Sequence, residues 1–289
     1  MKPEISVLIV TYNSAGYIVN CLKSLVSSKK INFEVILIDN NSTDNTLTLI
    51  KNYPVKIIKN NKNIGFGPAN NLAARHAKGE YFFFLNPDCI LTDQNLLYKL
   101  YIKMVKNKHL GVVSPNSFMD INNNKVHYSL PYVNRFGVIY HNIKFEDYKG
   151  RGITAYSKIN GRSDPELLYT DSVRGAHLFV KKELFDKLGG FDESFFLYGE
   201  ETDLCLRTWK AGYSVGIYLN CSIYHKGLSS PGIFNRYISW VSSQTTFIKK
   251  WVPYALPLWF LFYLPIRTWE NTLDLLKFKK MWNTKVSIT

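Results

Sequence analysis

Acidic residues are scarce in this sequence: 22 Asp and Glu stand against 36 Lys and Arg, giving a formal net charge of +14. Such an excess favours anionic partners, namely phosphates, nucleic acid or an acidic membrane surface. A genome biased toward Lys and Asn codons is the alternative explanation. Internal repeats are also lacking, which argues against a solenoid. No nucleic-acid partner is expected, because no helix-turn-helix, RNA-recognition signature or Lys/Arg stripe accompanies the charge.

Cysteine is equally rare. The four cysteines, Cys21, Cys89, Cys205 and Cys221, form no CxxC pair, and no histidine lies at zinc-finger spacing from them. We therefore expect reduced, mostly buried thiols in a cytoplasmic protein rather than a disulfide scaffold. The N-terminus runs directly into a strand-like segment, so no signal peptide is expected.

The length and the pattern of the first half predict an α/β fold. A chain of 289 residues has room for one large domain and a smaller appendage. Continuous apolar runs rich in β-branched residues predict strands buried on both faces at 5–11, 33–39, 55–59 and 81–85. Helical patterns lie between them, so the strands form βαβ units of a parallel sheet.

Polar side chains gather where three of these strands end. The clusters are Thr11-Tyr12-Asn13, Asp39-Asn40-Asn41 and Asn86-Pro87-Asp88. Ligands of such sheets bind beyond the carboxyl ends of the strands, and the topology brings the three clusters to one edge. The sequence therefore predicts a ligand site at this edge.

The second half of the chain is less regular. Its predicted elements are a helix beyond Asp93, strands at 111–114, 169–173, 177–180, 214–218 and 222–225, and a helix at 182–188. Residues 120–165 are polar and weakly patterned, and we expect an insertion that shapes the site of a second substrate. The stretch LYGEETDLCLR places three carboxylates in four positions, at Glu200, Glu201 and Asp203, between apolar residues.

Five motifs occur in an ordered series: SVLIVTYNSAGYIVNCLKSL, VILIDNNSTDNT, NIGFGPANNLAARHAKGEYFFFLNPDC, RGAHLFVKKELFDKLGGFDESFFLYGEETDLCLR and a later YH. Together they resemble the inverting family 2 glycosyltransferases, above all the rhamnosyltransferase-like members that build bacterial surface polysaccharides. The resemblance covers roughly residues 4–230. It implies a nucleotide-diphosphosugar transferase fold of the GT-A type, with a mostly parallel central sheet flanked by helices and a helical C-terminal extension.

The resemblance implies that the first two strand ends bind the nucleotide-sugar donor. Asp39 ends a buried strand, where its carboxylate can accept the imide N–H of uracil or thymine. Thr11 and Tyr12 would flank that ring by hydrogen bonding and stacking, with Asn13 beside them. The alternative is that Asp39 caps the next helix.

The glycine-containing loop NIGFGPANN supplies further predicted donor contacts. Asn63, Gly65 and Asn71 stand where backbone N–H groups before a helix suit a phosphate or the base edge. Arg75, one helical turn later, would reach a donor anion. A plain turn at the helix entry and a solvated surface arginine are the alternatives.

Asn86-Pro87-Asp88 occupies the place of the family's Asp-x-Asp motif. In that motif, oxygen ligands hold a divalent ion against the departing diphosphate. Asn86 replaces the first Asp and still offers a neutral oxygen, so Asp88 supplies the only carboxylate. His225 lies at the family's usual distance beyond the acidic cluster and is the second predicted metal ligand, with a structural histidine as the alternative. We expect weak binding of Mg²⁺ or Mn²⁺, mostly through the diphosphate.

The acidic cluster is predicted to supply a general base. A carboxylate that takes the acceptor's proton contributes roughly 10²–10⁴-fold in rate. The family's Glu-Asp-x-Asp-Leu pattern uses its second position, which is Glu201 here, and apolar surroundings raise the pKa of such a group. Glu200 is assigned to the acceptor, and Asp203 to a structural ion pair with Arg207. The alternative is an ordinary acidic first turn of a helix.

Arg174, Gly175 and Ala176 precede an apolar strand and are predicted to bind the acceptor. Gly175 permits close approach of a sugar to the backbone, and Arg174 would meet an acceptor phosphate. A simple turn before a strand is the competing interpretation.

The composition becomes aromatic and basic near residue 231. The apolar segment 251–266 is shorter than the about 20 residues that a membrane span needs, and three prolines interrupt it. Aromatic residues mixed with cations suit the headgroup region of an anionic bilayer. We therefore expect peripheral attachment to the inner face of the cell membrane. A helical hairpin packed on the sheet or a homodimer interface is the alternative.

These observations predict a glycosyltransferase domain at 1–230, with a nucleotide-sugar half at 1–115 and an acceptor half at 116–230, and an extension at 231–289. The expected reaction is inverting transfer of rhamnose from dTDP-rhamnose, or of a hexose from a UDP-sugar, to a glycan or lipid-linked acceptor in cell-surface polysaccharide synthesis. A non-catalytic partner in a polysaccharide-assembly complex stays open, because Asn86 and Glu201 depart from the family pattern.

Overall fold

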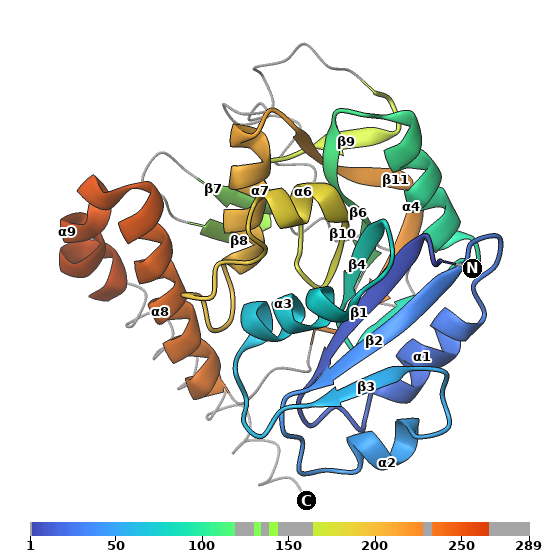
Figure 1. Ribbon diagram of the computed structural model, residues 1–289. Helices are drawn as coiled ribbons and strands as arrows, with labels where there is room; N and C mark the ends of the chain where they lie inside the picture. Colours follow the sequence, from blue (N-terminus) through green and yellow to red (C-terminus); the bar gives the residue numbers. More distant parts are fainter. Residues whose placement is uncertain (1, 119–129, 134–138, 144–163, 228–232, 266–289) are drawn as a thin grey trace, which may run out of the picture.

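Strands and helices alternate through the first half of the chain in a computed structural model, which describes residues 2–118, 130–133, 139–143, 164–227 and 233–265 (Figure 1). The elements of this half are β1 (Ile5–Thr11), α1 (Ile18–Val26), β2 (Phe33–Asp39), α2 (Thr46–Ile50), β3 (Lys56–Lys59), α3 (Phe66–His76) and β4 (Tyr81–Leu85). The four strands are parallel and lie in the order β3-β2-β1-β4. This confirms the predicted parallel sheet.

The second half extends the sheet with strands of both directions. Its elements are β5 (Cys89–Leu91), α4 (Leu96–Lys106), β6 (Leu110–Phe118), β7 (Leu130–Val133), β8 (Ile139–Ile143), β9 (Leu167–Tyr169), β10 (His177–Lys181), α6 (Lys182–Lys187), α7 (Glu200–Lys210) and β11 (Ser214–His225). The order continues from β4 as β10-β6-β11-β5, while β9 pairs with β11 and β7 pairs with β8 in a separate hairpin. The strands β10 and β5 run antiparallel to their neighbours, so the sheet is mixed.

The direction of these two strands determines which residues share an edge of the sheet. His177, at the start of β10, lies opposite Leu85 at the end of β4. Cys89, at the start of β5, lies opposite His225 at the end of β11. His177 and Cys89 therefore lie at the same edge of the sheet as the carboxyl ends of β1 and β2.

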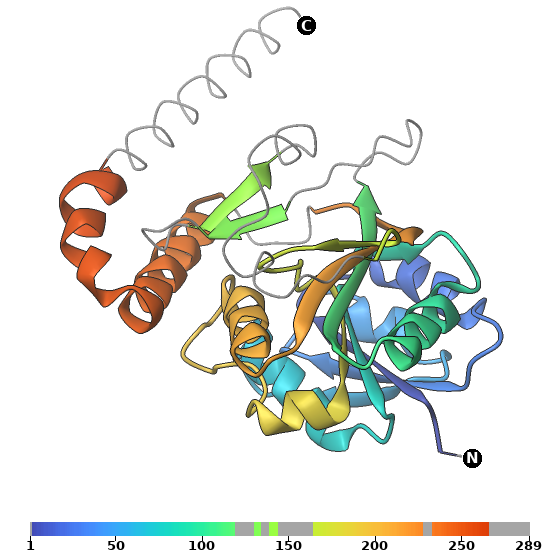
Figure 2. The ribbon, with the colours of Figure 1, turned by 90° about the horizontal axis from the view of Figure 1, so that it is seen from above.

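Helices cover both faces of the sheet (Figure 2). The helices α1, α2 and α4 lie on one face, and α3, α6 and α7 lie on the other. On the latter face Phe84, Phe185 and Phe191 are buried, with ring centroids 4.8–5.4 Å apart. This aromatic core attaches the loop before α7 to the sheet.

Three predicted features differ from the structure. The strands expected at 214–218 and 222–225 are one strand, β11, with a register irregularity between Tyr218 and Ser222. The strand expected at 169–173 is instead β9, which ends at Tyr169 and is followed by a loop in which the Thr170 hydroxyl donates to the Ser172 carbonyl. Of the predicted insertion at 120–165, only β7, β8 and residues 164–165 lie inside the described part of the chain, so its role stays a prediction.

A C-terminal helical region lies against this domain. It contains α8 (Ile233–Trp251), the 3₁₀ turn η2 (Pro253–Ala255), α9 (Leu256–Leu258) and the π-helical turn η3 (Trp259–Tyr263). Phe247 of α8 forms a buried cluster with Phe195 and Leu206, so the inner face of α8 packs against α7 and the loop before it. Among the residues described, none of the helices has both the length and the apolar composition that a membrane span requires.

Candidate active site

Asp39 is the most tightly held carboxylate at the ends of the first strands. It is 1% exposed, and its two oxygens accept hydrogen bonds from Thr11 Oγ1 (2.9 Å), Ser42 Oγ (2.6 Å) and the Ser42 backbone N–H (2.9 Å). Oδ1 accepts both hydroxyl groups and Oδ2 accepts the N–H, so Oδ2 keeps a further lone pair for a ligand. Tyr12, which follows Thr11, is 41% exposed and leaves an aromatic ring open to solvent at this edge.

Asn13 joins the loops that follow β1 and β2. Its backbone is in the left-handed region, with φ of 51°. Its side-chain oxygen accepts the backbone N–H groups of Thr43 (2.8 Å) and Asp44 (3.3 Å), and its own N–H donates to Ser42 Oγ (2.9 Å). These bonds fix the two predicted donor loops relative to each other.

The glycine loop before α3 is fixed against the same edge. Asn40 Nδ2 donates to Asn63 Oδ1 (3.2 Å) and to the Gly65 carbonyl (3.1 Å). Gly65 has φ of +93°, and a Cβ there would lie 2.5 Å from the Phe196 carbonyl oxygen. Only glycine fits this close contact, which places the loop beside the segment that precedes α7.

Asn71 and Arg75, also predicted to contact the donor, lie further along α3. Both ends of the buried Asn71 amide are hydrogen bonded to the Phe191 backbone, at 2.9 Å each, so Asn71 joins α3 to the loop before α7. Arg75 is exposed in the last turn of α3, about 14 Å along the helix axis from its start. The next residue, His76, contacts Lys56 at the start of β3, which is the opposite edge of the sheet.

Asp88 and His225 meet where β5 pairs with β11. Asp88 is buried, its Oδ1 lies 3.4 Å from His225 Nε2, and its Oδ2 accepts the Gly227 N–H at 3.0 Å. The N–H of the half-buried Asn86 donates to the Ala176 carbonyl at 2.8 Å, which fixes the Asn-Pro-Asp turn against the start of β10. The structure thus brings the two predicted metal ligands together.

Two buried residues beside this pair were not predicted. The Cys89 thiol lies in a group with Asp88 and His225 whose ligand atoms are all within 4.8 Å of one another. His177 Nδ1 is 2.7 Å from Ser114 Oγ, and its ring stands edge-on to that of His225 with centroids 5.8 Å apart. Burial, and then the neighbouring His225, hold the pKa of His177 well below its usual value. No sequence pattern marks either residue, since both positions depend on strand pairing.

Glu201 occupies the first turn of α7. It is 8% exposed, and its Oε2 accepts the Gly199 N–H at 3.1 Å. A Cβ on Gly175 would lie 3.2 Å from Glu201 Cβ, so this glycine lets the two segments approach closely. Burial raises the pKa of Glu201, while backbone hydrogen bonds and the positive charge of Arg174 act in the opposite direction.

Glu200 faces a different neighbour. It is 3% exposed and lies beside Gly67 of α3. Burial and then the charge of Glu201 raise the pKa of Glu200 well above its usual value. Its Oε2 has no hydrogen-bond partner among the residues that the structure describes. Such a group is suited to bind a polar ligand atom.

Arg174, Gly175 and Ala176 form the connection between the two carboxylate sites. Gly175 contacts Glu201, and the Ala176 carbonyl accepts the N–H of the turn that carries Asp88. Burial lowers the pKa of Arg174, and the charge of Glu201 partly offsets this effect. The predicted base and the predicted metal ligand therefore lie on either side of one three-residue segment.

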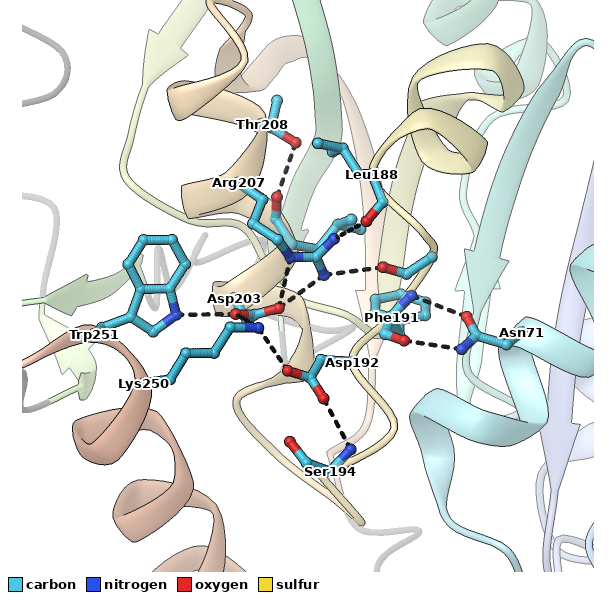
Figure 3. A network of polar contacts seen from close by, with 12 residues as sticks. Asn71, Leu188, Phe191, Asp192, Ser194, Asp203, Arg207, Thr208, Lys250 and Trp251 are labelled. Carbon is cyan, nitrogen blue, oxygen red and sulfur yellow. Dashed lines mark hydrogen bonds and ion pairs between the residues drawn. The ribbon is translucent and has the colours of Figure 1, made fainter.

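Asp203 has a structural position, as expected. It is fully buried, and its Oδ2 lies 2.8 Å from Arg207 Nε and 2.7 Å from Arg207 Nη2. Its Oδ1 accepts Lys250 Nζ at 2.7 Å and Trp251 Nε1 at 2.9 Å, both from α8 (Figure 3). Lys250 also pairs with Asp192 at 2.5 Å. The helix that carries Glu201 is thus joined to the C-terminal region through charged groups.

Family comparisons agree with this geometry. A family model for "Glycosyl transferase family 2" matches residues 6–159, more than half of the 289-residue chain. A second model, "N-terminal domain of galactosyltransferase", matches residues 156–226. The chain therefore belongs to glycosyl transferase family 2 and is a glycosyltransferase.

Two curated relatives illustrate the breadth of the similarity. Rhamnosyltransferase WbbL of Escherichia coli K12 is 28% identical over 218 residues, which cover 71% of this chain and 77% of the relative. Glycosyltransferase GlyG of Streptococcus pneumoniae is 30% identical over 123 residues, covering 41% of this chain and 40% of the relative.

Solved structures share the GT-A fold. The mannosyltransferase PcManGT of Pyrobaculum calidifontis, in complex with GDP-Man and Mn²⁺, superposes with a TM-score of 0.62 at 19% identity, over 86% of this chain and 64% of that chain. Residues 1–349 of Staphylococcus aureus TarS, in complex with UDP-GlcNAc, give 0.53 at 19% identity, over 86% and 66% of the chains. These likenesses confirm the fold.

Proposed function

We propose that the protein transfers a sugar from a nucleoside diphosphate donor to a hydroxyl group of a glycan or lipid-linked acceptor, with inversion of the anomeric carbon. The acceptor oxygen bonds to that carbon, the bond between the carbon and the diphosphate oxygen breaks, and the acceptor proton passes to Glu201. A single displacement of this kind needs a positioned base and a stabilised leaving group.

The position of Glu201 is the observation that carries this proposal. Its pKa is raised by burial, and a carboxylate with a raised pKa is a stronger base toward a hydroxyl proton. Gly175 has no side chain, so its backbone approaches Glu201 closely. The Arg174–Ala176 segment that packs on Glu201 also holds the turn that carries Asp88. Base and leaving-group site are therefore neighbours.

The donor nucleotide is proposed to bind at the ends of β1 and β2. Asp39, held by Thr11, is oriented to accept the imide N–H of uracil or thymine, and the exposed Tyr12 ring offers a stacking surface. Asn13, Asn63 and Gly65 would complete this side of the site. The donor we favour is dTDP-rhamnose, with a UDP-hexose as the second candidate, and the relative named as a rhamnosyltransferase supports the first.

Asp88 and His225 fit a divalent ion, and the half-buried Asn86 would offer a further oxygen. His225 Nδ1 is buried without a hydrogen-bond partner among the described residues, so a bound ligand could satisfy this nitrogen. A bound Mg²⁺ or Mn²⁺ would neutralise the charge that develops on the departing diphosphate. Two relatives were crystallised with Mn²⁺, which agrees with such a site.

We propose that the acceptor enters beside Arg174, Gly175, Ala176 and Glu200. Arg174 carries a positive charge toward an acceptor phosphate. Glu200 Oε2 is buried without a hydrogen-bond partner among the described residues, so it offers a polar contact to a sugar hydroxyl. This places the acceptor hydroxyl between Glu201 and the donor.

The C-terminal region is proposed to attach the enzyme to the inner face of the cell membrane. Beyond α8, Tyr254, Leu258 and Leu261 are 70%, 50% and 68% exposed, and Lys249 is exposed in the last turn of α8. Apolar and aromatic side chains next to cations suit an anionic bilayer surface. Co-sedimentation with anionic vesicles that high salt reverses would support attachment, whereas equal binding to neutral vesicles would refute its electrostatic part.

A division of the chain is proposed as well. Residues 1–115 would supply the nucleotide-sugar half, 116–230 the acceptor half, and 231–289 the extension. A panel of nucleotide sugars, assayed for nucleoside diphosphate release with and without Mn²⁺, tests the function directly. Release from one donor, dependent on the Glu201 carboxylate, is the expected result. No release from any donor would favour the second candidate, a non-catalytic partner in a polysaccharide-assembly complex.

A further inference from the structure

Three different ligand atoms converge at the start of β5. Asp88 offers a carboxylate oxygen, His225 an imidazole nitrogen and Cys89 a thiol sulfur, and these atoms lie within 4.8 Å of one another. All three residues are buried. Oxygen, nitrogen and sulfur donors on neighbouring strands form a candidate set for a transition-metal ion.

The pairing of β5 with β11 builds this set into the sheet. Cys89 is the direct antiparallel partner of His225, and side chains of directly opposed residues project from the same face of a sheet. Asp88 is held beside them, because its Oδ2 accepts the Gly227 N–H and its backbone carbonyl accepts the Lys226 N–H at 3.2 Å. The cluster therefore results from strand register and from two backbone anchors.

The protein satisfies part of the cluster's hydrogen bonding, since the Cys89 thiol donates to the Ala176 carbonyl with sulfur and oxygen 3.4 Å apart. His225 is 8% exposed and its Nδ1 has no partner among the residues that the structure describes. Its Nε2 is 3.4 Å from Asp88 Oδ1, which is long for a hydrogen bond between the two groups. In a tetrahedral zinc site, bond lengths of 2.0–2.3 Å put sulfur and nitrogen ligands about 3.6 Å apart. The present spacing needs only a small contraction to reach that arrangement.

We propose that Cys89 is a third protein ligand of the divalent ion, completing an Asp88-Cys89-His225 site. The inference rests on the proposed function, because it concerns the ion that would serve the donor diphosphate. Thiolate and imidazole ligands favour Zn²⁺ and Co²⁺ over Mg²⁺ and Mn²⁺, which prefer oxygen. On binding, the sulfur–metal bond replaces the S–H bond and the thiol proton leaves to solvent.

The three ligand atoms of Asp88, Cys89 and His225 predict a preference for Zn²⁺ and Co²⁺ that the Asn-Pro-Asp turn alone does not predict. A site of one carboxylate, one amide oxygen and waters would accept Mg²⁺ readily. With sulfur and nitrogen ligands, Co²⁺ and Zn²⁺ bind tightly to the protein without any nucleotide sugar. The pale Co²⁺ spectrum of an oxygen site is replaced by an intense near-ultraviolet band from sulfur-to-cobalt charge transfer.

The test is titration of the full chain with Co²⁺, followed by absorption spectroscopy and by equilibrium dialysis. We expect one Co²⁺ per chain and a charge-transfer band that Cys89→Ser removes. The same substitution should lower Co²⁺ affinity by at least about 10-fold, because losing a ligand should cost more than losing a residue that only hydrogen bonds to a ligand. The matched control is Cys221→Ser, which should keep the band. Cys221 is also buried but lies on β11 rather than on β5. A band that survives in Cys89→Ser, or none in the parent protein, overturns the proposal.

A measurement on the unsubstituted chain guards against a variant that fails to fold. The ¹¹³Cd resonance of the cadmium-loaded protein shifts strongly downfield when a thiolate is a ligand, and a resonance typical of oxygen and nitrogen ligands alone overturns the assignment. Both readouts are independent of turnover. Nucleoside diphosphate release that depends on Mn²⁺ in a protein without the sulfur signature would refute the Cys89 ligand and leave the transferase function standing.

Discussion

The junction between α7 and α8 makes a strong prediction about stability. Asp203 is fully buried and accepts four nitrogen donors, two from Arg207 and one each from Lys250 and Trp251 (Figure 3). Asp203→Asn preserves the shape of the side chain but removes its charge and turns one acceptor into a donor. Arg207, whose side chain is 19% exposed, then keeps a positive charge with no carboxylate beside it.

Removing one partner of a buried ion pair costs about 3–5 kcal/mol. Lys250 is 34% exposed and can regain water, so the lower half of this range applies. At about 2–4 °C per kcal/mol for a chain of this size, thermal unfolding monitored by circular dichroism should begin on the order of 10 °C earlier.

Asp186→Asn is the matched control for this prediction. Asp186 forms the same (i, i+4) pair with Lys182, but the two side chains are 53% and 38% exposed. Exposed pairs contribute about 0.2–1 kcal/mol, so this variant should unfold within about 3 °C of the parent. Equal unfolding temperatures for Asp203→Asn and Asp186→Asn would refute the structural role of the junction.

Three further outcomes are expected from the structure. Gly65→Ala should destabilise the protein by about 1–3 kcal/mol in urea unfolding, because alanine strains a backbone at φ +93° and its Cβ meets a carbonyl 2.5 Å away. Hydrogen bonds from Lys250 and Ser194, opposed by partial burial, lower the pKa of Asp192 to about 2. Because the pKa of Asp192 is depressed, its contacts stabilise the fold fully above about pH 4, and this contribution is lost as the pH falls toward 2. A scan of unfolding temperature against pH should therefore be steeper for the parent than for Lys250→Met. Arg174→Gln should move the acidic limb of the kcat/KM profile to higher pH, because the charge of Arg174 lowers the pKa of the base.

Each of these outcomes has a contrary result. Gly16→Ala, at a position with no atom within 4 Å of the added Cβ, should be close to neutral. A Gly65→Ala variant as stable as Gly16→Ala would contradict the contact described for the loop. Equal pH dependence of the unfolding temperature for the parent and Lys250→Met would show that the Asp192 contact does not stabilise the fold. An acidic limb that stays in place in Arg174→Gln would mean that a group other than Glu201 titrates.

The sequence predicts the first four strands well because each is a continuous apolar run between polar residues. The runs at 5–11, 33–39 and 81–85 coincide with β1, β2 and β4. Their shared direction follows from the helices between them, so the convergence of Thr11 and Asp39 at one edge is predictable. The close contact of these two side chains, at 2.9 Å, agrees with that reasoning.

The second half is harder to predict because pairing there depends on distant segments. The strand β5 has three residues, and nothing local shows that Cys89 lies opposite His225. The same is true of Ala176, whose carbonyl joins the Asn-Pro-Asp turn to the segment beside Glu201. The donor contacts of Asn71 and Arg75 stay predictions, because the motif fixes where α3 begins and each later residue lies about 1.5 Å further along the helix axis.

The most direct measurement of the central claim compares transfer and donor binding in Glu201→Gln. Glutamine keeps the size of the side chain but cannot take a proton, so transfer should fall by roughly 10²–10⁴-fold, which corresponds to about 3–5 kcal/mol of barrier. Donor affinity, measured by calorimetry with the nucleoside diphosphate, should stay within about threefold of the parent because Asp39 and Asp88 are unchanged. Transfer within about threefold of the parent would show that Glu201 is not the base.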